Sequence, residues 1–85
     1  MRDMLTQSQH ERLEKILDKP WVGSLTYFRA MKADWDRIEG LGFATKRQLP
    51  DTGYYGSADL WEYTITASGI IEVAEAKERA RLRNA

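Results

Sequence analysis

The chain has no cysteine among its 85 residues, so neither a disulfide nor a zinc site with cysteine ligands can stabilise it. A chain of this length buries only roughly 60–65% of the surface that its unfolded form exposes. A chain this short can form only one hydrophobic core, and no cross-link supports that core. We therefore expect residues 1–85 to form a single domain of modest stability, and the missing cysteine excludes a thiolate nucleophile.

Opposite charges balance along the chain. The sequence holds 13 Lys and Arg against 13 Asp and Glu, a formal net charge of zero, and its isoelectric point is about 6.6. This balance argues against a protein that coats nucleic acid by bulk attraction. No apolar run is long enough to span a membrane, and the first ten residues lack the apolar core of a secretory signal. We expect a cytoplasmic protein with no membrane partner.

Prolines and glycines divide the chain into four segments, and the first two have helical patterns. Thr6 and Gln9 have the spacing of a capping box, and Pro20 should end this first helix near residue 18 or 19. Ser24 is a residue type that caps helices, and it predicts a second helix over residues 24–39, stopped by Gly40 and Gly42. The apolar stripe of this second helix is Leu25, Phe28, Met31, Trp35 and Ile38.

The third segment predicts a two-stranded β-hairpin. Its strands are residues 43–49 and 60–65, and a long loop rich in Pro, Asp and Gly joins them. Alternation along residues 60–65 places Trp61, Tyr63 and Ile65 on one face. The hairpin can press this face against the apolar stripe of the second helix.

The fourth segment predicts a C-terminal helix from about residue 66 or 68 to the early eighties, with Thr66 as its cap. Acidic residues lie early in this helix and basic residues lie late, which complements the helix dipole. The apolar face that we expect consists of Ile70, Val73, Ala74 and Ala80, with Ile71 and Leu82 beside it.

The order helix, helix, two-stranded hairpin, helix predicts an α+β fold, a small winged-helix-like domain. Two phrases resemble MarR-like and PadR-like transcriptional regulators: residues 35–43 (WDRIEGLGF) resemble a recognition helix entering a wing, and residues 63–69 (YTITASG) resemble the phrase after it. The resemblance covers roughly residues 35–73 and implies a winged helix-turn-helix, DNA binding and a homodimer. This chain departs from those families in lacking their long added helices.

The helix-turn-helix is also shortened. Only about 17 residues run from Gly23 to Gly40, and the apolar stripe is continuous. Either a very short helix lies near residues 23–28, or the two helices are fused into one. Both arrangements weaken the expectation that a distinct helix reads the major groove.

Duplex DNA is the first partner that we expect, held by cations and aromatic residues on the second helix and the wing. Residues 29–49 carry five cations and three anions, a small positive surplus that would contact phosphates. The candidate DNA-binding residues are Arg29, Lys32, Arg37, Lys46 and Arg47, with Tyr54 and Tyr55 at the wing tip.

A protein partner is the alternative, with a winged-helix scaffold that has lost its DNA contact. Large aromatic side chains dominate interface hot spots, and Trp21, Tyr54 and Tyr55 lie beside turn signals where a surface position is expected. Trp35, Trp61 and Phe28 are better explained as core. The C-terminal helix could also pair with its copy in a dimer.

No pattern in the sequence indicates an enzyme. His10 is the only histidine, and with Glu14 at i+4 it would supply too few ligands for a tight metal site. Asp34 and Asp36 are two residues apart on a helix and do not face each other. The glycines at 40 and 42 lack the spacing of a phosphate-binding loop. We expect no catalytic residue, no metal and no cofactor.

Overall fold

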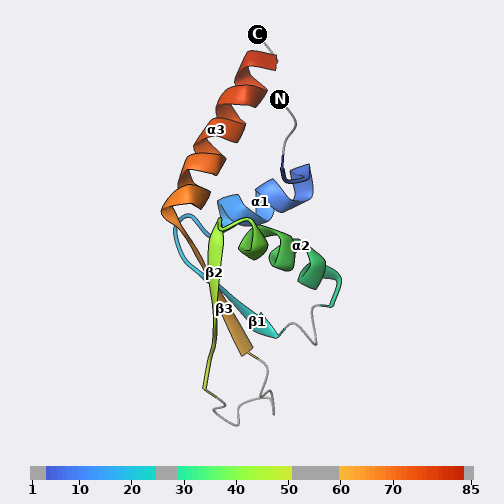
Figure 1. Cartoon of the computed structure of the whole chain (residues 1–85), viewed down its shortest axis with the longest axis vertical. Helices are drawn as coiled ribbons and strands as arrows, with labels where there is room; N and C mark the ends of the chain where they lie inside the picture. The colour runs from blue at the N-terminus through green and yellow to red at the C-terminus, as the bar shows by residue number, and fades with distance from the viewer. Residues whose placement is uncertain (1–3, 25–28, 51–59, 84–85) are drawn as a thin grey trace.

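The computed structural model describes residues 4–24, 29–50 and 60–83. Over these residues the chain forms helices and one antiparallel sheet, which confirms the α+β class (Figure 1). No helix in these three ranges is both long and apolar enough to cross a membrane. In chain order the elements are α1 (Gln7–Lys15), β1 (Trp21–Ser24), α2 (Arg29–Gly40), β2 (Ala44–Gln48), β3 (Leu60–Ile65) and α3 (Ala67–Arg83).

The sheet has three strands in the order β1-β3-β2, one more than the two-stranded hairpin that the sequence predicts. The predicted hairpin exists as β2 and β3, and β1 pairs with the other edge of β3. Ser24 does not cap a helix, because it is the last residue of β1 and lies opposite Leu60. Four residues are too few for alternation to identify a strand, and only pairing with β3 fixes this one.

The start of α1 lies where the sequence predicts it, and the end of α1 does not. The predicted capping box is present: the Gln9 amide donates to Thr6 Oγ1 over 3.2 Å, and the Thr6 amide donates to Gln9 Oε1 over 3.0 Å. The helix ends at Lys15, earlier than predicted, with Ile16 as its C-cap. Its last turn tightens there, since the Leu17 amide donates to the Glu14 carbonyl.

The core centres on a stack of three aromatic rings from three elements. Trp35 of α2 stacks on Tyr63 of β3 with ring centroids 4.7 Å apart, and on Trp21 of β1 at 5.3 Å. Leu13 of α1 and Ile38 of α2 are also fully buried. The predicted apolar stripe of α2 is therefore confirmed where it is described, while Leu25 and Phe28 lie outside the described residues.

The turn between α2 and β2 is hydrogen-bonded to the start of α3. Gly42 adopts the left-handed conformation at φ 82°, which glycine tolerates best. The Thr66 hydroxyl donates to the Gly42 carbonyl over 2.7 Å and accepts the Gly69 amide over 3.1 Å, so it caps α3 as predicted.

Gly69 sets the rotation of α3. A Cβ at this position would lie 2.1 Å from the Phe43 carbonyl oxygen, so only glycine lets the helix come this close. The face turned inward then carries Gly69, Glu72 and Val73. The predicted apolar face is correct for Val73 and wrong for Ile70, which is 50% exposed. A close backbone approach decides the buried side here, and hydrophobicity does not.

Substituting Gly69 with alanine should destabilise the protein by about 2–3 kcal/mol, because the added methyl meets rigid backbone. The matched control is Gly40→Ala, where an added Cβ meets nothing within 4 Å. That variant should be neutral or up to about 1 kcal/mol more stable. Chemical denaturation followed by circular dichroism measures both, and equal midpoints for the two variants would contradict the close contact.

Among the described residues, the Tyr63 hydroxyl has no hydrogen-bond partner although it is buried. Burial, with a smaller contribution from the charges of Asp36 and Glu39, raises the pKa of this tyrosine to about 12. Tyr63→Phe should stabilise the protein by about 1 kcal/mol, because an unpaired buried hydroxyl is costly. Tyrosine ionises near pH 10 in an unfolded chain. Stability should therefore fall from pH 10 to pH 12 in the wild type, and less steeply in the variant. Unfolding curves across that range test this; parallel declines would count against it.

Candidate nucleic-acid interface

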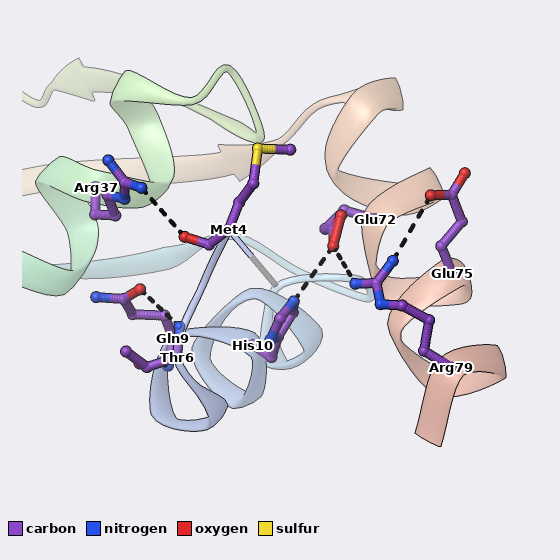
Figure 2. A network of polar contacts seen from close by, with 8 residues as sticks. All are labelled: Met4, Thr6, Gln9, His10, Arg37, Glu72, Glu75 and Arg79. Atoms are coloured by element: carbon purple, nitrogen blue, oxygen red, sulfur yellow. Dashed lines mark hydrogen bonds and ion pairs between the residues drawn. The ribbon is translucent and has the colours of Figure 1, made fainter. Parts of the chain in front are cut away.

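The three candidate cations of α2 all lie on its exposed side. Arg29 opens the helix, and its side chain makes no hydrogen bond or ion pair with the described residues. Lys32 pairs with Asp36 one turn later, with 2.8 Å between Nζ and Oδ2. Arg37 donates to the Met4 carbonyl over 3.4 Å (Figure 2). The helix surface therefore presents cations, of which Arg29 is the least engaged.

The two candidate cations of β2 face opposite sides of the sheet. Lys46 lies opposite Tyr63, whose ring is buried under α2, so Lys46 belongs to the side that α2 covers. Its ammonium lies 5.4 Å from the centre of the Trp61 ring. Neighbouring strand residues alternate between faces, which places Arg47 on the other face. There it lies opposite Glu62 and pairs with it, 3.0 Å between Nη2 and Oε1.

The aromatic candidates are divided as well. Tyr54 and Tyr55 lie outside the described residues. Trp21 was expected at the surface, but it is only partly exposed and its ring stacks on Trp35. Trp61 is partly buried against the core, as predicted. Of the aromatic residues proposed for a partner surface, Trp21 thus serves first as packing for the core.

An ion pair between α1 and α2 orients the candidate surface. Arg12 Nε donates to Asp34 Oδ2 over 2.8 Å, and the Gln9 amide group donates to Asp34 Oδ1 over 3.1 Å. The bond from Arg12 holds the pKa of Asp34 below its usual value near 3.8. Asp34 therefore ties the two helices together, and both of its carboxylate oxygens are engaged with α1.

A buried carboxylate is the feature that the sequence did not reveal. Glu72 of α3 is only 6% exposed, and it accepts a hydrogen bond from Arg79 over 2.7 Å (Figure 2). The Nε2 atom of His10 on α1 lies 3.4 Å from the same oxygen. A glutamate in a helix rich in charged residues is expected to be exposed to solvent. Only the seven-residue spacing from Glu72 to Arg79, two helical turns, hinted that this pair shares a face.

A groove of about 420 Å³ runs between α1 and α3. Polar side chains of α1 form one wall, and two alanines and an arginine of α3 form the other, so both signs of charge lie along the groove. In the part of the chain that the structure describes, no three His, Asp or Glu residues come together as metal ligands. The lining residues are Gln7, His10, Glu11, Glu14, Ala76, Ala80 and Arg83.

Comparison with known proteins returns no match: no family model, no curated protein and no solved structure is similar to this chain.

The Arg12–Asp34 pair predicts an acid-sensitive step. Because the pKa of Asp34 is lowered in the folded protein, its contribution to stability is full above about pH 4 and is lost as the pH falls further. Asp34→Asn should cost roughly 1–2 kcal/mol at neutral pH and flatten the acid dependence. Asp36→Asn, which breaks an exposed pair, should cost much less. Urea titrations at pH 7 and pH 3 compare the two, and equal costs would contradict the role given to Asp34.

Proposed function

We propose that this chain is a non-enzymatic DNA-binding domain of winged-helix type, similar in role to transcriptional regulators. In this proposal α2 lies near the duplex, and the β2–β3 hairpin acts as the wing. Arg29, Lys32 and Arg37 contact phosphates from the helix, and Lys46 contacts them from the hairpin. Tyr54 and Tyr55, which lie outside the described residues, would contact the DNA backbone.

The observation that supports this proposal best is that Lys46 lies on the α2 side of the sheet. The helix and the hairpin then offer cations to one partner from one side of the domain, which phosphate contacts require. Arg47 lies on the opposite face, where it pairs with Glu62. We therefore assign it to the sheet and leave it out of the proposed DNA surface.

A protein-interaction module on the same scaffold is the second candidate, and the internal pairing of the cations favours it. Lys32, Arg37 and Lys46 each contact another group of the chain, and the net charge is zero. A surface whose charges are already matched attracts phosphate weakly. Under this alternative the aromatic residues Tyr54 and Tyr55, with the exposed part of Trp21, would bind the partner.

The salt dependence of binding separates the two candidates. We expect the protein to bind a fluorescent random-sequence duplex with micromolar affinity at low salt, and binding should collapse as the salt concentration rises. Arg29→Ala and Lys46→Ala should each weaken binding severalfold and lower the salt slope by about one. Fluorescence anisotropy at several salt concentrations gives both quantities.

The matched control is Arg47→Ala, which removes the neighbouring cation from the opposite face of the same strand. It should leave duplex affinity unchanged. Equal losses for Lys46→Ala and Arg47→Ala would contradict the proposed geometry, and no binding at low salt would favour the protein-interaction module.

A further inference from the structure

The sheet ends at β2, and no other strand of the described ranges pairs with the outer edge of β2. Proteins commonly protect such an edge with a bulge or a proline. The pairing of β2 with β3 runs over Ala44–Gln48 without a bulge, and this stretch contains no proline. Residues 45–48 are all exposed. The outer edge of β2 is therefore shaped to accept an added strand.

The hydrogen bonds at the two ends of β2 show which residues face this edge. The Thr66 amide donates to the Phe43 carbonyl, and the Leu49 amide donates to the Leu60 carbonyl. In an antiparallel ladder every second residue bonds the neighbouring strand, so the odd-numbered residues of β2 bond β3. The even-numbered residues turn their N–H and C=O groups outward, and Lys46 is the central one.

The charge of β2 selects the kind of strand that fits. Its sequence ATKRQ holds two cations and no acidic residue. Lys46 contacts the Trp61 ring but makes no ion pair with the described residues. Arg47, on the other face, pairs with Glu62, and its several N–H donors allow it to bind a second carboxylate. An acidic segment along the edge therefore meets a cation on each face of the sheet.

The same charges disfavour a second copy of β2 on this edge. In an antiparallel pair that overlaps fully, Lys46 would lie directly opposite its own counterpart. In a parallel pair in register, both cations would lie beside their counterparts. Like charges directly opposite each other on neighbouring strands are destabilising. The other edge strand, β1, has only four residues and no charge (WVGS), so it makes no such selection.

We propose that the outer edge of β2 binds an extended acidic segment of a partner protein as an added strand. The backbone of Lys46 exchanges two hydrogen bonds with the residue opposite it. Consecutive residues of a strand point to opposite faces, so two consecutive acidic residues of the segment meet Lys46 on the α2 side and Arg47 on the other. The added strand depends on the backbone of β2 and stands whether or not the chain binds DNA.

A synthetic peptide tests the added strand. The probe is a fluorescent, end-blocked Thr-Val-Glu-Glu-Val-Thr, and its matched control carries glutamine in place of both glutamates. The contact is short, so we expect a Kd on the order of 100 µM, and binding about tenfold weaker for the control. N-methylation of one alternating set of peptide amides should abolish binding, and N-methylation of the other set should not. Equal effects of the two sets would overturn the proposal, as would equal binding of the two peptides.

Two variants of Lys46 separate the backbone from the side chain. Lys46→Ala removes the charge and should weaken peptide binding about fivefold. Lys46→Pro also removes the outward N–H and should weaken it at least about tenfold more, while the pairing with β3 tolerates a proline whose ring points away from the ladder. The proposed DNA contact involves the ammonium alone, so duplex affinity should fall equally for both variants. Equal peptide affinity of the two variants would overturn the added strand and leave the DNA proposal intact.

Amide hydrogen exchange followed by NMR examines the edge in the unaltered protein. The Lys46 amide should exchange fast in the free protein, whereas the Thr45 amide, which bonds β3, should exchange slowly. With peptide at ten times its Kd, exchange at Lys46 should slow about tenfold, because only the unbound fraction exchanges. Unchanged exchange at Lys46 would overturn the proposal. So would protection at Lys46 that rises with protein concentration in the absence of peptide, because it would assign the edge to a second copy.

Discussion

The rings of Trp21, Trp35 and Tyr63 join β1, α2 and β3, and the remaining elements are arranged around them. Trp35 stacks on the other two rings, at 5.3 and 4.7 Å, and those two rings are themselves 6.1 Å apart. In a domain with so little interior, three large rings supply much of the apolar surface that folding buries. These rings also carry a polar cost, since Trp35 Nε1 and the Tyr63 hydroxyl are buried and have no hydrogen-bond partner in the part of the chain that the structure describes. Burial of the rings must outweigh those two unpaired groups.

Local signals predicted those parts of the fold that depend on local physics. The capping box of α1, the glycine stop after α2, the hairpin strands and the Thr66 cap depend on residues close together in the sequence, and all four are present. The strand β1 could not be predicted in this way, because it exists through pairing with residues some forty positions later. Its Gly23 has a role visible only in three dimensions: a Cβ there would lie 2.5 Å from the Trp21 ring.

At the candidate site, the sequence likewise does not show which charges face a partner. Lys46 and Arg47 are neighbours in the sequence, yet the pleat of β2 sends them to opposite faces. The composition gives only the summed charge of the two residues, whereas a partner on one face of the sheet would contact only one of them. Asp34 and Asp36 are likewise close in sequence but differ in role: Asp34 joins α1 to α2, and Asp36 stays at the surface with Lys32. Which charges remain for a partner therefore depends on the internal pairs.

Short contacts hold the base of the hairpin against the start of α3. The Thr66 amide donates to the Phe43 carbonyl, its hydroxyl donates to the Gly42 carbonyl, and Gly69 lies against the same stretch of backbone. These contacts fix the direction of α3 relative to β2 and β3. The side of the domain on which Lys46 lies therefore depends on this junction as well as on the pairing of β2 with β3.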